Sequence, residues 1–125
     1  MVEIIVLPLW ETGHVMPYTG LAKQLRSRGH EVSFAGWGPM RGIVEAVGER
    51  YDPIFDELAP GTDDHNWRSQ MIEAFSTGRV AEELAARAPD LVLTDTSVPE
   101  MCLELRRSGL RHARVSITLP HTRRR

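Results

Sequence analysis

The sequence predicts a single α/β domain, residues 1–125, with a Rossmann-like parallel sheet and helices on both faces. Two observations predict this class. Short apolar or alternating runs suited to strands take turns with stretches of helical periodicity along the whole chain, and glycines and prolines separate them. A chain of 125 residues also fits one domain and is long enough to bury a core.

Five short runs have the character of strands. The first is β-branched and ends at Pro8, as expected of a strand buried on both faces. The third is weak and is interrupted by Pro53, which predicts a position at a sheet edge. The five predicted strands are residues 3–7, 30–35, 51–55, 90–94 and 113–117.

Helical periodicity fills the intervals between these runs. The first helix is predicted to begin at Pro17, a good first helical residue, and to end at Gly29 after about three turns. The third is expected to be one long or broken helix, because Thr77-Gly78 interrupts its apolar face. The predicted helices are residues 17–28, 40–47, 67–85 and 99–107.

The predicted strand order is 3-2-1-4-5. Sequential strand and helix units wind outward from the first strand and then restart on its other side. Ligands of such sheets bind beyond the carboxyl ends of the strands at this reversal. The informative loops are therefore residues 9–16 and 95–98.

The loop after the first strand offers one histidine for chemistry. It lacks both the glycine pattern of a dinucleotide site and the Gly-Lys-Ser/Thr of a P-loop. His14 is a candidate general base, because an imidazole titrates near neutral pH and can take a proton from a hydroxyl group. The alternative is a histidine that caps or packs the loop.

Asp95 ends the fourth predicted strand, beside the strand that leads to His14. Its carboxylate is placed to accept a hydrogen bond from the imidazole, which would fix the tautomer and stabilise the imidazolium. The alternative is a helix N-cap in the stretch 95–99. Both roles are compatible.

Three motifs together resemble the N-terminal domain of GT-B glycosyltransferases, in particular the family-1 enzymes that glycosylate small natural products. They are Thr12-Gly13-His14-Val15-Met16-Pro17, Gly29-His30-Glu31-Val32 and Pro89-Asp90-Leu91-Val92-Leu93-Thr94-Asp95. The resemblance covers nearly the whole chain. It implies that His14 deprotonates an acceptor hydroxyl and that Asp95 orients it.

The same resemblance implies inverting sugar transfer from a nucleotide diphosphate sugar, a co-substrate rather than a cofactor, with no covalent intermediate and no obligatory metal. It also implies a largely apolar acceptor cleft. Large apolar side chains at helical spacing are more often core than cleft wall, and this applies above all to Trp67, Met71 and Phe75. The residues available for the acceptor site are Trp10, Thr12, Gly13, Met16, Trp37, Trp67, Met71 and Phe75.

The chain departs from the resemblance because the donor-binding motif of the second GT-B domain is absent. The N-terminal domain itself is also expected to be incomplete, because the chain stops just after the fifth predicted strand. We therefore expect no turnover by this chain alone, which is either a truncated product or one half of a split enzyme whose partner brings the donor-binding half. A lipid-linked sugar transferase of cell-wall synthesis is a weaker match, since Trp10-Glu11 replaces its glycines. The alternative from another class is a non-catalytic module that binds a small molecule or a protein on the same fold.

Composition limits the partners and the cellular compartment that we expect for the protein. The net charge of −2 gives no reason to expect nucleic acid or an anionic membrane as partner. The single Cys102 cannot form an internal disulfide, which favours a reducing cytoplasm, and we expect it to be a small buried residue on a helix. The histidines have no spacing typical of a metal site. The three arginines at 123–125 are expected to be a solvated tail.

Overall fold

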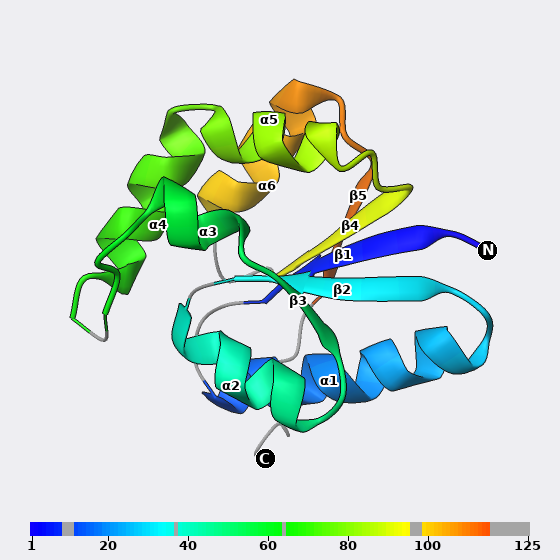
Figure 1. The fold of residues 1–125 in the computed structure, drawn as a ribbon. Helices are drawn as coiled ribbons and strands as arrows, with labels where there is room; N and C mark the ends of the chain where they lie inside the picture. The colour runs from blue at the N-terminus through cyan, green and yellow to red at the C-terminus, as the bar shows by residue number, and fades with distance from the viewer. Residues whose placement is uncertain (9–11, 37, 64, 96–98, 116–125) are drawn as a thin grey trace, which may run out of the picture.

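Five parallel strands form the centre of the molecule. The computed structural model describes residues 1–8, 12–36, 38–63, 65–95 and 99–115 (Figure 1). Each neighbouring pair of strands is parallel and the order is β3-β2-β1-β4-β5, which confirms the predicted topology. The strands are β1 (Glu3–Leu7), β2 (Glu31–Ala35), β3 (Arg50–Asp52), β4 (Leu91–Asp95) and β5 (His112–Val115).

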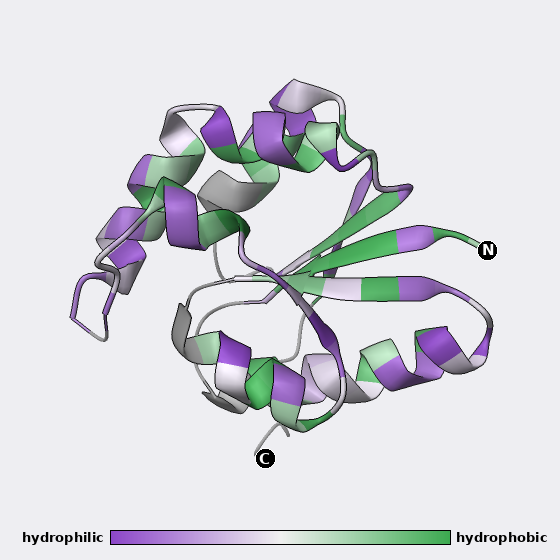
Figure 2. Ribbon diagram, in the orientation of Figure 1, coloured by the Kyte–Doolittle hydropathy of each residue, from purple (hydrophilic) through white to green (hydrophobic). Residues whose placement is uncertain are grey.

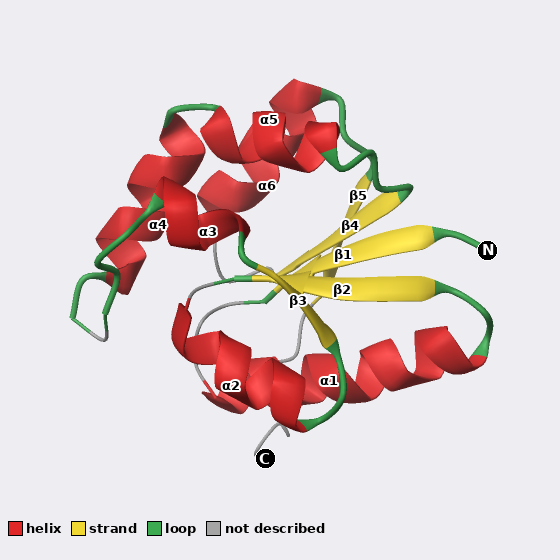
Figure 3. Cartoon of the chain, viewed as in Figure 1, coloured by secondary structure: helices red, strands yellow, loops and turns green. Residues whose placement is uncertain are grey.

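Helices cover both faces of this sheet, as Figure 3 shows. One layer consists of α1 (Thr12–Ser27) and α2 (Gly38–Ala46). The other layer consists of α3 (Ile54–Leu58), α4 (Trp67–Ser76), α5 (Arg79–Ala86) and α6 (Pro99–Ser108). None of the helices within the described ranges is long and apolar enough to span a bilayer.

The core lies on both sides of the central strands. Residues 4–7 of β1 are all buried, since helices cover both of its faces. Figure 2 shows this as a continuous apolar colour along the middle of the sheet, with polar colour on the outer helix surfaces. The helices add Val15 and Tyr18 from one layer, and Phe75 and Leu84 from the other, all at most 1% exposed.

The first helix is longer than predicted. It begins at Thr12, five residues before Pro17, so His14 lies in its first turn and not in a loop. Proline is disfavoured inside a helix because it cannot donate the hydrogen bond to the residue four positions earlier. Pro17 removes one such bond from the helix, and the buried Val15 and Tyr18 anchor the turns on either side of it.

The third strand is shorter than predicted. It ends at Asp52, and the residues after Pro53 form α3 instead of continuing the strand. Pro53 has no N–H group for the ladder, and the helix buries Ile54 and Phe55 together in the core. The predicted edge position of this strand is confirmed.

The long helical stretch is broken where its sequence indicated. Helix α4 ends at Ser76 and α5 begins at Arg79, and between them Gly78 has φ of 79°. Residues with a side chain rarely adopt this left-handed backbone conformation, so glycine is the residue suited to the break. The fifth strand is described from His112 to Val115, while positions 116 and 117 of the prediction lie outside the described residues.

Candidate functional site at the carboxyl ends of β1 and β4

The sheet brings the ends of β1 and β4 together. Leu7, the last residue of β1, is in register with Thr94, the residue before Asp95. On its other side β4 pairs with β5, where Asp95 is opposite Val115. The neighbouring positions that the sequence prediction required of β1 and β4 are therefore present in the fold.

Asp95 is buried at the carboxyl end of β4, with only 1% of its surface exposed. A side-chain hydrogen bond joins it to Tyr18, which is fully buried on α1. The one hydroxyl proton of Tyr18 is shared between this carboxylate and the backbone oxygen of Val115, which lies 3.2 Å from the phenol oxygen. The pKa of Tyr18 is raised well above its usual value, first by burial and then by the negative charge of Asp95 and the hydrogen bond to it. The phenol therefore stays protonated and holds the carboxylate in place.

Helix α1 gives Tyr18 this position because one of its faces is buried. Val15, Tyr18 and Ala22 follow one another at spacings of three and four residues, and each is 0% exposed. Side chains at such spacings share a helix face, and here that face packs on the sheet. Tyr18 thus reaches the end of β4 from the second turn of the helix.

His14 occupies the position one helical turn before Tyr18 on the same helix. Residues four apart lie on the same side of an α-helix, so position 14 and the residue that holds Asp95 belong to one side of α1. The side chains of Thr12 and His14, and the surroundings of Gly13, lie outside what the structure describes. The predicted contact between His14 and Asp95 stays a prediction.

Sequence reasoning missed Tyr18. The signal was present, since Tyr18 follows His14 by four residues. It could not be used because the helix was predicted to begin at Pro17, which placed His14 outside it. With the helix beginning at Thr12, the i, i+4 relationship applies and Tyr18 becomes a member of the site.

The residues predicted to line an acceptor cleft divide into exposed and buried ones. Met16 is 44% exposed, on the first turns of α1. Trp67 is half-buried against the core, and the Arg68 guanidinium lies 5.0 Å from its ring centroid. Met71 and Phe75 are each 1% exposed and belong to the core, which is the packing alternative. Trp10 and Trp37 lie outside the described residues.

Cys102 and His30 have ordinary surroundings. Cys102 is half-buried on α6 rather than fully buried, and its sulfur lies 3.5 Å from the hydroxyl of Thr94. His30 follows the end of α1, and its Nδ1 accepts a hydrogen bond from the backbone N–H of Val2 at 3.3 Å, which is a structural role. Within the described ranges, no three histidine, cysteine or acidic residues are grouped as metal ligands would be.

Known proteins provide an independent comparison. No protein-family model and no curated protein sequence matches the chain. Solved structures do match. SsfS6, a glycosyltransferase of Streptomyces sp. SF2575 that has also been crystallised with thymidine diphosphate, is 25% identical with a TM-score of 0.64. The spinosyn forosaminyltransferase SpnP is 27% identical with a TM-score of 0.70.

The chain has the fold of the N-terminal domain of GT-B glycosyltransferases. The alignment covers 94% of the chain in both comparisons, with 40% of SsfS6 and 31% of SpnP. The chain therefore spans less than half the length of these GT-B enzymes. MurG of Acinetobacter baumannii has the same fold, with a TM-score of 0.67, 15% identity, and alignment over 93% of this chain and 35% of MurG.

Proposed function

We propose that the chain is the acceptor-binding and catalytic-base part of an inverting glycosyltransferase. In this proposal a sugar moves from a nucleotide diphosphate sugar to the hydroxyl group of a small molecule. The observation that carries the proposal is the buried Asp95, hydrogen-bonded by Tyr18 one helical turn after His14, at the carboxyl ends of β1 and β4. This is the edge at which open α/β sheets bind ligands.

The proposed reaction is a single displacement. His14 takes the proton of the acceptor hydroxyl while the oxygen attacks the anomeric carbon of the donor sugar. The bond between that carbon and the diphosphate breaks, and the nucleoside diphosphate leaves with the electron pair. Asp95 orients the imidazole and stabilises its positive charge, and the neutral Tyr18 phenol fixes the carboxylate without competing for the proton.

The donor is proposed to bind elsewhere. SsfS6 has been crystallised with thymidine diphosphate, and the chain aligns with 40% of that enzyme. We therefore propose that a separate donor-binding half holds the nucleotide sugar, and that the chain is inactive without it. Trp10, Thr12, Gly13, Met16 and Trp67 remain proposed acceptor contacts, whereas the burial of Met71 favours a core role.

A second candidate is a non-catalytic module that binds a small molecule or a partner protein on the same fold. It rests on the fold alone, because the same α/β fold serves both catalysis and binding in different proteins. The two candidates differ in whether binding of an acceptor leads to transfer when a donor-binding half is present.

The decisive experiment measures transfer in the chain joined to, or mixed with, the donor-binding half of SsfS6, using a thymidine diphosphate sugar and a panel of hydroxylated aglycones. We expect transfer that His14→Ala lowers by about a hundredfold or more, since general bases contribute that much. His65→Ala is the matched control, because His65 is exposed in a turn between α3 and α4. Full transfer by His14→Ala would refute the base assignment. Aglycone binding without transfer in every combination would favour the binding module.

A further inference from the structure

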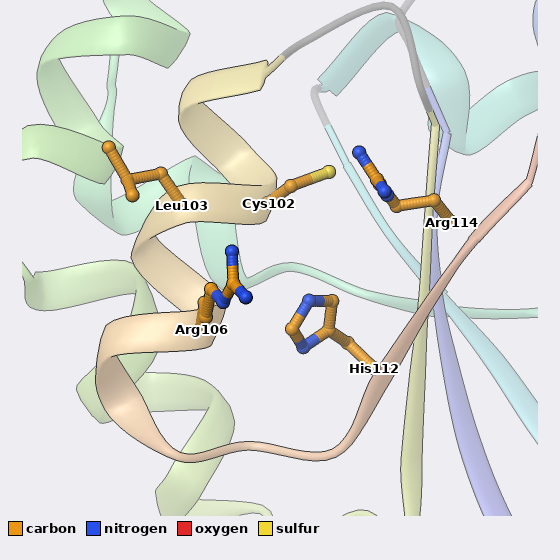
Figure 4. Close-up of a pocket in the computed structure, with 5 residues that line it drawn as sticks. All are labelled: Cys102, Leu103, Arg106, His112 and Arg114. Carbon is orange, nitrogen blue, oxygen red and sulfur yellow. The ribbon is translucent and has the colours of Figure 1, made fainter.

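A hollow lies between α6 and β5, apart from the candidate site described above. It has a volume of about 480 Å³ and is lined by Cys102, Leu103, Arg106, His112 and Arg114. Figure 4 shows the arginine, histidine and cysteine side chains extending toward one another from the helix and the strand. Among the residues that the structure describes, this lining contains two guanidinium groups and an imidazole, and no acidic residue.

The two guanidinium groups have no acidic partner among the described residues, in contrast to Arg26, Arg41, Arg50 and Arg87, which all form ion pairs. Arg106 lies in the last turn of α6, where the helix dipole also stabilises a positive charge. Arg114 lies on a strand, so no such effect accounts for it. Residues 105–115 carry four arginines and no acidic residue, in a chain whose net charge is −2.

His112 is held in a defined orientation within this hollow. Its Nδ1 lies 3.0 Å from the backbone oxygen of Leu110. A carbonyl oxygen only accepts hydrogen bonds, so Nδ1 carries the proton and Nε2 is left for a ligand. Leu103, which is 54% exposed, and Cys102 provide an apolar wall beside the cationic groups.

We propose that this hollow is a binding site for a small molecule that carries a phosphate group. The phosphate oxygens accept hydrogen bonds from Arg106 and Arg114, whose planar guanidinium groups suit bidentate contacts with phosphate. The apolar part of the ligand lies against Leu103. The volume of about 480 Å³ is in the range of small-molecule sites. The site uses neither His14 nor Asp95 and does not depend on the proposed transferase function.

The test titrates the chain with inorganic phosphate and, separately, with phenyl phosphate, at constant ionic strength set with sodium chloride, and follows amide shifts by NMR. We expect saturable binding, tighter for phenyl phosphate because of the Leu103 wall. Arg106→Gln and Arg114→Gln should each weaken it about tenfold or more, the size expected for a hydrogen bond to a charged group. Arg107→Gln and Arg111→Gln are matched controls, exposed neighbours that do not line the hollow.

Cys102 provides a second readout in the unaltered chain. It is the only cysteine and it lines the hollow, so bound ligand should slow its alkylation by iodoacetamide. Saturable binding, protection of Cys102 and a selective loss in the two lining variants would support the site. If neither inorganic phosphate nor phenyl phosphate protects Cys102 from alkylation, the proposed site is overturned. An equal loss in the control variants would also overturn it, since that result indicates general attraction to a basic surface.

Discussion

Two buried acidic residues, Asp95 and Glu49, show how differently the fold uses the same chemistry. Asp95 is 1% exposed and Glu49 is 5% exposed. Helix α1 supplies a partner for each of them, near its opposite ends. Tyr18 in the second turn is hydrogen-bonded to Asp95, and Arg26 in the last turn donates to Glu49 at 2.6 Å.

The partners of the two acidic residues indicate that Asp95 belongs to a candidate functional site and that Glu49 has a structural role. Glu49 precedes β3, at the amino end of the strand, and forms an ion pair whose guanidinium is 42% exposed. Asp95 is the last residue of β4, at the carboxyl ends of the strands, where open α/β sheets in general bind ligands, and the phenol beside it is neutral. A neutral partner leaves the charge of Asp95 available to an imidazolium. The position along the strand therefore distinguishes Asp95, the acidic residue of the candidate site, from Glu49, the structural one.

The largest expected difference is in activity. Asp95→Asn should lower the kcat of the transfer assay by about a hundredfold or more, because an amide stabilises an imidazolium less well than a carboxylate does. Glu49→Gln should leave kcat unchanged, since Glu49 is remote from the ends of β1 and β4. Steady-state kinetics of both variants measures the contrast. Equal kcat values for the two variants would remove the distinction drawn here.

The next effect is on stability. Arg26→Met leaves the buried carboxylate of Glu49 without its cation and should cost about 2 kcal/mol in the free energy of unfolding. Glu49→Gln should cost less, because the half-exposed Arg26 that remains is hydrated. Urea denaturation of both variants gives the comparison. A larger loss for Glu49→Gln would show that burial of Glu49 is not the dominant cost.

A smaller effect compares the two tyrosines. Tyr18→Phe and Tyr51→Phe should each cost about 1 kcal/mol, because each removes a hydrogen bond from a phenol to a backbone oxygen. Tyr51 bonds to the oxygen of Gly36 at 2.8 Å, near the β3 edge of the sheet. Only Tyr18→Phe should also slow transfer, since only Tyr18 contacts Asp95. Slower transfer in both variants would argue against a positioning role for Tyr18.

The last comparison is made at alkaline pH. Burial, together with nearby acidic groups, raises the pKa of both tyrosines above the ordinary value of 10.0. Above pH 10 the unfolded chain therefore loses these protons first, and the stability of the folded state falls as pH rises. The near-ultraviolet absorbance of phenolate should stay low in the folded protein at a pH where free tyrosine ionises. Each Tyr→Phe variant should flatten the fall, and an unchanged slope would contradict the assigned shifts.

Local pattern accounts for most of the fold. The apolar run of β1, the break at Gly78 and the order β3-β2-β1-β4-β5 were all predictable, because each follows from a period, a backbone requirement or a winding rule. The errors lie at two prolines. Pro17 and Pro53 were treated as a helix start and a strand interruption, and in both cases packing of the neighbouring apolar residues decided the boundary.

The sequence by itself determined the sheet, its reversal point and the placement of His14 and Asp95 toward that point, because parallel strands deliver their following residues to one edge. The tertiary structure decided which side chains lie close together at the carboxyl ends of β1 and β4 and in the rest of the fold. Tyr18 with Asp95 and Arg26 with Glu49 are pairs that are separated along the chain, and Arg106 and Arg114 line one hollow from a helix and a strand. Such contacts depend on how a helix is rotated against a sheet, and a one-dimensional pattern does not specify that rotation.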